Sequence, residues 1–396
     1  MGTDQNLILS INAGSSSVKL ALFNDKLEKL AELIAADIGL SNSRLTISTL
    51  DTTTTKQIDL ADHHQAAESL FNALPNQNLL NGVVGIGHRV VHGGLKYSEP
   101  IQINNDVIEN LRALYVYDPD HMPAALSLIE WCQQTFANTL QIACFDTAFF
   151  AKMPEVATTI ALPNQYRTNG LRRYGFHGLS YEYILHAFAA RAGDTAAKGR
   201  VVMAHLGSGA SLAAIVNGQV ADTTMSFSPS SGIVMSTRSG DIDPGIVGFL
   251  MSQTDMTIDD FNRVINKESG LLGVSGISAD MELLINRSAT DENASLAVEL
   301  FCYQTRKAIG GLATTIGGLD SLIFTGGIGE NAPLIRQKIC NGLSYFGVEL
   351  DPARNHNHDF LISSDSSRIG VHVIKTDEAA IIAAKTKQLI NQAGGE

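Results

Sequence analysis

The alternation of apolar runs and polar turns along the chain predicts an α/β protein. Short apolar runs typical of strands lie at residues 7–11, 18–23, 45–49 and 56–60. Residues 64–74 carry apolar side chains at helical spacing, and residues 377–392 form a second amphipathic segment after a strand predicted at 371–375. Strands that alternate with helices in this way are typical of the α/β class.

One pattern occurs twice, which indicates two related domains. Residues 7–23 and 201–216 each read as a strand, a polar residue, a Gly/Ser turn and a second strand. A similar signal follows at 321–339, where an apolar run meets Gly-Gly-Ile-Gly and then a helix. We therefore expect an N-terminal domain at 1–147 and a C-terminal domain at 148–378, with the last helix, 379–396, packed back on the first domain.

Composition narrows the class of protein. The 396 residues, 44% of them hydrophobic, are enough for two domains that each have a core. A net charge of −12 without any Lys/Arg-rich run argues against nucleic-acid binding. We expect no signal peptide and no membrane span, because the N-terminus lacks a basic segment and no apolar run approaches ~20 residues. Four widely spaced cysteines suggest reduced thiols in a cytoplasmic protein.

The first turn offers more hydrogen-bonding groups than a hairpin needs. Gly14 and the three serines 15–17 present amides and hydroxyls that can approach phosphate oxygens, and Lys19 shares the sheet face of Ser17. A solvated serine-rich hairpin is the alternative. Further glycine loops at 207–209 and 326–329, each leaving a strand, favour a nucleotide site. The GxxxxGK[ST] spacing is absent, so a P-loop is not predicted.

Several charged residues stand among small or apolar neighbours. Arg89 and Arg238 are flanked by glycines and hydroxyls, and two guanidiniums could hold the oxygens of a moving phosphoryl group. Asp146 and Glu378 follow apolar strands, where carboxylates can bind Mg²⁺, although either could be a structural cap. His177 could donate to developing negative charge, or it could be structural.

Seven blocks in order along nearly the whole chain resemble the acetate and propionate kinase family. They are "INAGSSSVK" (11–19), "GHRVVHGG" (87–94), "CFDTAFF" (144–150), "RRYGFHGLSY" (172–181), "TRSGDIDPG" (237–245), "NKESGLLGVSG" (266–276) and "FTGGIGEN" (324–331). The resemblance implies two duplicated ribonuclease-H-like domains of the actin-like ATPase group, with ATP in an interdomain cleft. It also implies a homodimer and reversible, Mg²⁺-requiring phosphorylation of a short-chain carboxylate by ATP.

Residue roles follow from the same resemblance. Phosphate contacts are implied at Asn12, Ser15, Ser17, Lys19, His205, Gly207, Ser208 and Gly209. Adenosine contacts are implied at Asp280, Gly327, Ile328, Gly329 and Asn331. The acid substrate would meet Arg89, Val91, Asp120, His121, Phe176 and Pro229. Catalytic roles fall to Asn12, Arg89, Asp146, His177 and Arg238, and a Mg²⁺ site to Asn12, Asp146 and Glu378.

The chain departs from the family pattern at several positions. Ser208 stands where relatives usually have Asn, Ser236 replaces a glycine, and "SPSSG" (228–232) replaces "TPLEG". Asp120 stands where an apolar Leu is common; a buried unpaired carboxylate there would cost several kcal/mol. One hypothesis is therefore a preference for a more polar small acid. Two further hypotheses are a nucleotide-binding homologue without turnover and a related phosphotransferase such as a sugar kinase.

Overall fold

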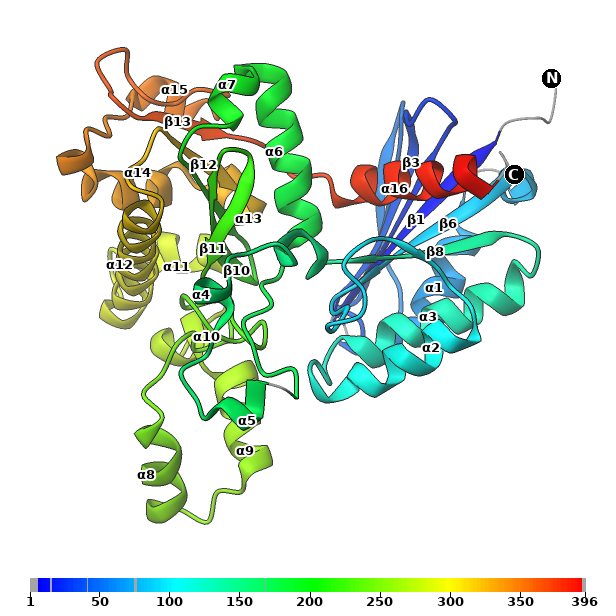
Figure 1. Ribbon diagram of the computed structural model, residues 1–396, viewed down its shortest axis with the longest axis horizontal. Helices are drawn as coiled ribbons and strands as arrows, with labels where there is room; N and C mark the ends of the chain where they lie inside the picture. Colours follow the sequence, from blue (N-terminus) through cyan, green and yellow to red (C-terminus); the bar gives the residue numbers. More distant parts are fainter. Residues whose placement is uncertain (1–5, 15, 41, 75–76, 168, 394–396) are drawn as a thin grey trace. The chain divides into compact units, whose positions relative to one another are not determined.

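Two mixed β-sheets, each with helices on both faces, organise the chain (Figure 1). The computed structural model describes residues 6–14, 16–40, 42–74, 77–167 and 169–393. These fall into two units. Unit 1 joins Met1–Phe149 to Asp377–Glu396, and unit 2 is Phe150–Thr376.

Unit 1 contains the strands of the first sheet and the helices that cover it. Its strands are β1 (Leu7–Ala13), β2 (Ser17–Phe23), β3 (Lys29–Ala36), β4 (Arg44–Thr49), β5 (Thr53–Gln57), β6 (Val83–Val90), β7 (Ile101–Gln102) and β8 (Leu140–Phe145). Its helices are α1 (His63–Asn72), α2 (Asn105–Arg112), α3 (Met122–Thr135) and α16 (Glu378–Ala393), with 3-10 turns η1 (Gln77–Gly82) and η2 (Ala113–Val116). A further turn, η3 (Ala148–Phe150), lies at the boundary with unit 2.

The order of the first sheet is β5-β4-β3-β2-β1-β6-β8-β7. Strands β1 to β5 form an antiparallel meander, while β1, β6 and β8 are parallel neighbours. Alternation along β1 sends Leu7, Leu9 and Ile11 into the core shared with α1 and α3, whereas Ile8 packs towards α16. The period-2 pattern of β1 therefore divides its side chains between two helical layers.

Helix α16 packs closely on this sheet because β6 carries glycines beneath it (Figure 1). A Cβ on Gly85 would lie 2.4 Å from Cδ1 of Ile390, and one on Gly87 would lie 2.2 Å from Oγ1 of Thr386. The glycines in "VVGIGHRV" thus serve helix–sheet packing. They bring Glu378, the first residue of α16, to the unit that also contains Arg89.

Unit 2 repeats the architecture with larger helical insertions. Its strands are β9 (Val201–Leu206), β10 (Ala210–Val216), β11 (Gln219–Thr223), β12 (Ser321–Thr325) and β13 (Gly370–Val373). Its helices are α4 (Glu155–Thr158), α5 (Asn164–Arg167), α6 (Gly178–Ala192), α7 (Asp194–Ala197), α8 (Gly245–Gln253), α9 (Ile258–Arg263), α10 (Gly270–Ser275), α11 (Met281–Arg287), α12 (Glu292–Thr315), α13 (Gly326–Asn331), α14 (Pro333–Asn341) and α15 (Pro352–His356). A π-helical turn, η4 (Val264–Glu268), and a 3-10 turn, η5 (Ser344–Phe346), complete the unit.

The second sheet has the order β11-β10-β9-β12-β13. Strands β9, β10 and β11 are antiparallel neighbours, and β9, β12 and β13 are parallel ones. The same sequence of pairings occurs in β3-β2-β1-β6-β8 of unit 1, so the repeat in the sequence corresponds to a repeated topology. Helix α6 packs against β9, and α12 packs against β9, β10 and β11.

The structure corrects two details of the predicted elements. The segment after Phe23, expected to be a short polar connection, contains β3, in which two of the three buried positions, Ala31 and Ala35, are small and only Leu33 is large. The strand expected at 56–60 is shifted, because β5 ends at Gln57. Within the described residues, every helix is too short or too polar to cross a membrane.

Candidate functional site

The parallel strands of unit 1 bring three predicted site residues to one edge of the sheet. Asn12 lies near the end of β1, Arg89 near the end of β6, and Asp146 directly after β8. Parallel neighbours end at the same edge, which is where α/β proteins bind ligands. Glu378 joins them as the first residue of α16.

These four side chains form one hydrogen-bonded network. Arg89 donates to Oδ2 of Asp146 through Nε (3.1 Å) and Nη2 (2.6 Å), and to Oδ1 of Asn12 through Nη1 (3.1 Å). Asn12 in turn donates through Nδ2 to Oε2 of Glu378 at 2.7 Å. Nε of Arg89 lies 4.0 Å from the same Glu378 oxygen. The guanidinium is therefore fixed between two carboxylates.

Burial makes this network costly unless its charges are balanced. The Asp146 side chain is 0% exposed and that of Arg89 is 14% exposed. Burial raises the pKa of the Asp146 carboxyl; the Arg89 guanidinium opposes this rise and Glu378 adds to it. Burial alone would lower the pKa of Arg89, but the Asp146 and Glu378 carboxylates more than offset it, so the guanidinium stays charged.

The donor set fits a divalent cation. Oδ1 of Asp146 is buried and has no hydrogen-bond partner in the described part of the chain. No three His, Cys, Asp or Glu side chains gather as a metal-binding group among the described residues. The set at this edge consists of two carboxylates and one amide, all oxygen donors that suit Mg²⁺.

His121 is held by an aspartate that the sequence did not single out. Its Nδ1 lies 2.8 Å from Oδ1 of Asp118, whose side chain is buried. Asp120, two residues after Asp118, is exposed. The burial cost that motivated the hypothesis of a more polar acid therefore does not arise in this structure.

The first turn is partly described. The amide of Gly14 donates to the carbonyl of Ser17 at 2.8 Å, and Lys19, paired with Asn12 across β1 and β2, has an exposed side chain. Nε2 of His63 lies 2.7 Å from the Gly14 carbonyl. Ser15 lies outside the described residues.

A second group of predicted residues comes together in unit 2, at the turn between β9 and β10. The turn is Gly207, Ser208 and Gly209, closed by a 3.1 Å hydrogen bond from the Gly207 amide to the Gly209 carbonyl. A Cβ on Gly209 would lie 3.3 Å from Nε2 of His177 and 3.5 Å from Nη1 of Arg238. His177, His205 and Arg238 thus all belong to the surroundings of this turn.

His177 and Arg238 are both held by their local backbone. His177 has φ 62°, an uncommon left-handed conformation for a residue other than glycine, directly before α6. Such strain concentrates at functional sites. Nη1 of Arg238 donates to the Pro229 carbonyl at 3.1 Å. This contact ties the arginine to a residue that the sequence assigned to the substrate pocket.

The predicted adenosine residues lie on α11 and α13. Asp280 is the N-cap of α11, where its carboxylate accepts a hydrogen bond from the amide of Leu283. Asn331 donates to the Gly327 carbonyl within α13, which also contains Ile328 and Gly329. Gly326 begins α13 with φ 76°, and a Cβ there would lie 2.7 Å from the Leu206 carbonyl oxygen.

Two buried or half-buried charges that sequence reasoning missed hold α13. The carboxylate of Glu330 accepts from the amides of Gly326 (2.9 Å) and Thr376 (3.0 Å). Arg336, which is 0% exposed, donates to the carbonyls of Gly329 and Glu330 and to Asn355. Both residues hold the backbone of α13, the predicted adenosine-binding segment, through hydrogen bonds.

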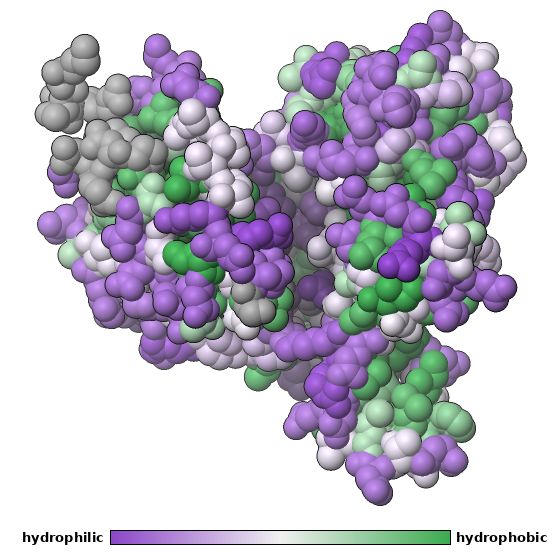
Figure 2. All heavy atoms as spheres, turned by 180° about the vertical axis from the view of Figure 1, so that it is seen from behind, coloured by the Kyte–Doolittle hydropathy of each residue, from purple (hydrophilic) through white to green (hydrophobic). Residues whose placement is uncertain are grey.

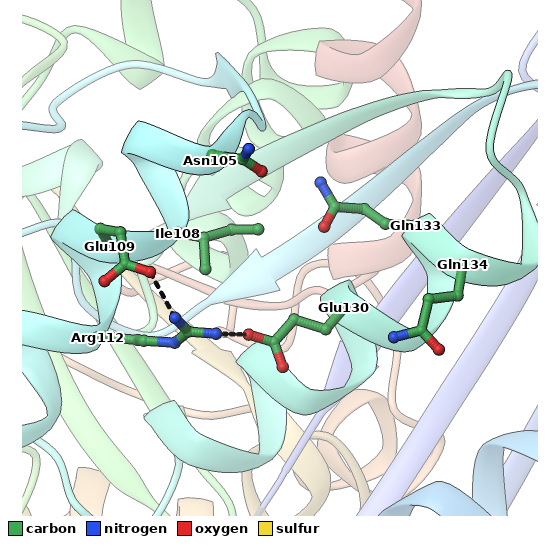
Figure 3. Close-up of a pocket in the computed structure, with 7 residues that line it drawn as sticks. All are labelled: Asn105, Ile108, Glu109, Arg112, Glu130, Gln133 and Gln134. Carbon is green, nitrogen blue, oxygen red and sulfur yellow. Dashed lines mark hydrogen bonds and ion pairs between the residues drawn. The ribbon is translucent and has the colours of Figure 1, made fainter.

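One cavity in the structure is lined by residues of α13, and another lies away from the predicted site residues. One of about 540 Å³ in unit 2 is lined by Glu330 and Asn331 of α13 together with Tyr183, Arg191 and Lys375. Another, of about 460 Å³, lies between α2 and α3, where Arg112 is paired with Glu109 and Glu130 (Figure 3). It contains none of the predicted site residues.

Comparison with known proteins identifies the family. The model of the acetokinase family matches residues 7–384. The chain belongs to the acetokinase family. An acetate kinase of Clostridium botulinum (strain Alaska E43) is 40% identical over 399 residues, covering 97% of this chain and 100% of the relative.

Solved structures of acetokinases agree with this assignment. A propionate kinase from Francisella tularensis has a TM-score of 0.90 and 36% identity, covering 97% of this chain and 99% of its own. Porphyromonas gingivalis acetate kinase has a TM-score of 0.86 and 35% identity, covering 97% and 100%. The predicted fold class, the duplicated actin-like ATPase fold, is thereby confirmed, as is the predicted family.

The remaining residues expected from the acetokinase pattern are distributed between the two units. Val91 is buried in unit 1, and Phe176 and Pro229 are buried in unit 2. Ser17 is half-buried in unit 1 and Ser208 is exposed in unit 2. The structure therefore brings together Asn12, Arg89, Asp146 and Glu378 in one unit, and His177, His205, Arg238 and the turn 207–209 in the other.

Proposed function

We propose that this protein transfers the γ-phosphoryl group of ATP to the carboxylate of a short-chain acid, acetate or propionate, and that the reaction is reversible. The observation that carries the proposal is the network of Asn12, Arg89, Asp146 and Glu378 in a chain of the acetokinase family. The relatives named acetate kinase and propionate kinase support these two acids.

Phosphoryl transfer to a carboxylate requires that the two reactants be aligned and that the negative charge on the phosphates be neutralised. A carboxylate oxygen attacks the γ-phosphorus and forms an O–P bond, while the bond from phosphorus to the β–γ bridging oxygen breaks and its electron pair leaves with ADP. The carboxylate is already ionised, so no general base is required. Guanidinium and imidazole groups, which donate hydrogen bonds to negatively charged oxygens, suit this reaction.

Arg89 is proposed to bind the substrate carboxylate and the phosphoryl group in transfer. Its three donor nitrogens are engaged with Asp146 and Asn12, so its orientation is fixed before substrate binds. Preorganised donors stabilise developing charge without reorganisation cost. In unit 2, Arg238 and His177 beside the 207–209 turn are proposed to contact phosphoryl oxygens of ATP.

Mg²⁺ is proposed to be held by Asp146 and Glu378, with Asn12 contributing to the site. The buried Oδ1 of Asp146, which has no partner among the described residues, is the observation that fits a cation. When bound, Mg²⁺ would neutralise negative charge on the ATP phosphates. Arg89 orients the Asp146 carboxylate through two hydrogen bonds to its Oδ2.

We also propose a cytoplasmic homodimer. ATP and Mg²⁺ are cytoplasmic reactants, which supports the compartment. Helix α8 supports dimerisation, because none of its residues is buried and apolar side chains on it are exposed (Figure 2). Phe249 on this helix is 63% exposed. Sedimentation of the wild-type chain and of Phe249→Asp tests this: the variant should sediment as a monomer.

The experiment that tests the activity is a panel of small acids with ATP and Mg²⁺. Acyl phosphate is trapped with hydroxylamine, and ADP release is followed in parallel. We expect both signals with acetate or propionate, and a loss of about 1,000-fold in Arg89→Ala with ATP binding retained. Arg112→Ala, which removes an arginine on α2, is the matched control and should leave turnover unchanged.

The competing hypotheses give different results in the same panel. ATP binding without ADP release for any acid would support a nucleotide-binding homologue without turnover. Turnover confined to hydroxylated acids would support the hypothesis of a more polar substrate. Phosphorylation of a sugar, tested in place of the acid, would support a sugar kinase. Collapse of ATP binding in Arg89→Ala would contradict the role given to Arg89.

A further inference from the structure

The cavity of about 540 Å³ in unit 2 has a volume typical of sites that bind small organic molecules. Its walls come from α6, α13, the end of β13 and the loop after α15 (Figure 1). Tyr183, Ala187 and Arg191 of α6 are four residues apart, so they share one face of that helix. Phe360 and Ile374 add apolar surface. The cavity therefore has room and apolar surface for more than a bare ion.

Two cations in the lining of this cavity lack a carboxylate partner. Among the described residues, the side chains of Arg191 and Lys375 form no ion pair and no hydrogen bond, and both residues are exposed. The chain as a whole is acidic, with a net charge of −12. Cations that line one cavity without a partner attract anions. An anion bound in the cavity would supply the missing partner.

Arg191 is held in place without the use of its hydrogen-bond donors. Its Cζ lies 3.8 Å from the centroid of the Phe360 ring. Phe360 is held in turn by the ring of His372, which also contacts Phe188 of α6, with both pairs of centroids 4.9 Å apart. A guanidinium carries five N–H donors in a planar fork that matches the oxygens of a carboxylate or a phosphate. The fork of Arg191 therefore remains available to a bound anion.

His358 adds a donor whose proton position follows from its neighbour. Nη2 of Arg336 lies 3.1 Å from Nδ1 of His358. Because a guanidinium can only donate, Nδ1 is the acceptor, and the ring carries its proton on Nε2. Arg336 is 0% exposed, so this contact is held from the interior of the unit. The Nε2–H group is the donor that His358 can offer to a molecule in the cavity.

The carboxylate in the lining does not cancel these charges. Oε1 of Glu330 accepts from the amides of Gly326 (2.9 Å) and Thr376 (3.0 Å), so backbone donors already stabilise its negative charge. Among the residues that line the cavity, the cations Arg191 and Lys375 stand against Glu330 alone. The lining therefore keeps a net positive charge.

We propose that this cavity binds a small organic phosphate monoester. Such a group carries a charge of about −1.5 to −2 at neutral pH and three acceptor oxygens. These match Arg191, Lys375 and the Nε2–H group of His358, whereas a carboxylate brings one charge and two oxygens. The organic part would lie against Tyr183 and Ile374. The site goes beyond the proposed phosphoryl transfer, which uses neither cation.

Calorimetric titration of the full chain with phenyl phosphate tests the proposal. We expect saturable binding, and an affinity about 10-fold or more lower in Arg191→Gln and in Lys375→Gln. Both residues are exposed, so these substitutions should not unfold the protein. Lys307→Gln removes the same charge from an exposed position of α12 and should bind like the wild-type protein. Absence of saturable binding, or equal affinity in the wild-type protein and both cavity variants, overturns the proposal.

Two further compounds test the chemical class. Inorganic phosphate lacks the ring and should bind about 10-fold more weakly than phenyl phosphate. Benzoate keeps a ring but carries a carboxylate, and it should also bind more weakly. Inorganic phosphate that binds as tightly as phenyl phosphate, or benzoate that binds more tightly, overturns the assignment to an organic phosphate monoester.

Nuclear magnetic resonance of the full chain labelled with ¹⁵N-histidine locates the bound molecule. His358→Gln identifies the ring of His358 by the loss of its signals. We expect a ring protonated on Nε2 in the free protein, and a shift of its Nε2 signal as phenyl phosphate is added. A ring protonated on Nδ1 alone, or an Nε2 signal that does not move, overturns the part given to His358.

The activity assay separates this site from the proposed function. Asn331 belongs both to the cavity and to the predicted adenosine segment, so ADP affinity and turnover are measured in Arg191→Gln as well. Both should equal those of the wild-type protein. A loss of either would make the cavity part of the nucleotide site and overturn the proposal. If the wild-type chain phosphorylates no acid, the proposed function fails, and the phenyl phosphate titrations still decide whether this site exists.

Discussion

Asp146 accepts two hydrogen bonds from Arg89 on a single oxygen. Nε and Nη2 of Arg89 lie 3.1 and 2.6 Å from Oδ2, while Oδ1 is buried without a hydrogen-bond partner in the described part of the chain. An unsatisfied buried acceptor costs about 1–3 kcal/mol. The arrangement therefore leaves half of a carboxylate ready for a ligand, and a cation would recover that cost.

Asp146→Asn is expected to lower kcat by about 100-fold or more, because the amide removes one negative charge from the proposed Mg²⁺ site. Binding of Mn²⁺ with ATP, followed by electron paramagnetic resonance, should weaken in parallel. Glu130→Gln removes the same charge from the Arg112 ion pair on α3 and serves as control (Figure 3). Equal losses in both variants would contradict a specific role for Asp146.

Arg336→Lys is expected to loosen α13. Lysine cannot reach both Asn355 and the carbonyls of Gly329 and Glu330, so buried acceptors lose partners and the free energy of unfolding falls by about 3 kcal/mol. KM for ATP should rise several-fold, if α13 binds the adenosine. Arg354→Lys, on the neighbouring α15, is the control. Lower stability with an unchanged KM for ATP would show that Arg336 is structural only.

Stability should decrease on acidification through His88. Burial lowers the pKa of His88 to about 4, against 6.5 ordinarily, while its Nε2 lies 2.8 Å from Oε1 of Gln141. Between pH 6.5 and about pH 4, His88 binds a proton in the unfolded chain but not in the folded one. Lowering the pH through this range therefore favours unfolding. From pH 7.5 to pH 5, His88 alone accounts for a loss of about 2 kcal/mol.

Urea unfolding at the two pH values measures this effect. His88→Gln removes the titrating group and should lose about 2 kcal/mol less than the wild-type protein between pH 7.5 and pH 5. His92 and His372, whose pKa values are also lowered to about 4 by burial, should still contribute in the variant. An identical pH dependence in both proteins would contradict the assignment to His88.

Asp120→Leu should leave acetate turnover within about twofold, because Asp120 is exposed and Asp118 is the residue that holds His121. Asp118→Asn keeps the shape but loses the charge, and should reduce turnover more than Asp120→Leu does. A large gain in acetate efficiency in Asp120→Leu would restore the idea that Asp120 acts in the substrate pocket.

The sequence predicted the parts of this molecule that repeat a strong local pattern. The apolar run at 7–11 and its echo at 201–216 indicated the duplicated α/β fold, and the end of an apolar strand located Asp146. The same local information could not show which of two nearby aspartates is buried. Asp118 is buried and Asp120 is exposed because of the path that the chain takes before α3.

Supporting residues were missed for a related reason. Arg191 lies in a helix and His358 in a polar loop, and neither has a motif of its own. Arg336 lies among helical charges and is buried only by tertiary contacts with α13 and α15. These roles follow from segments that are distant in sequence.

The central claim is that a carboxylate oxygen of the acid substrate attacks the γ-phosphorus of ATP. Phosphorus-31 magnetic resonance with ¹⁸O-labelled acetate tests it most directly, since the isotope shifts the signal of a directly bonded phosphorus. The account predicts one acyl phosphate for each ADP formed, with ¹⁸O in the bond to phosphorus. ADP and inorganic phosphate without labelled acyl phosphate would contradict it.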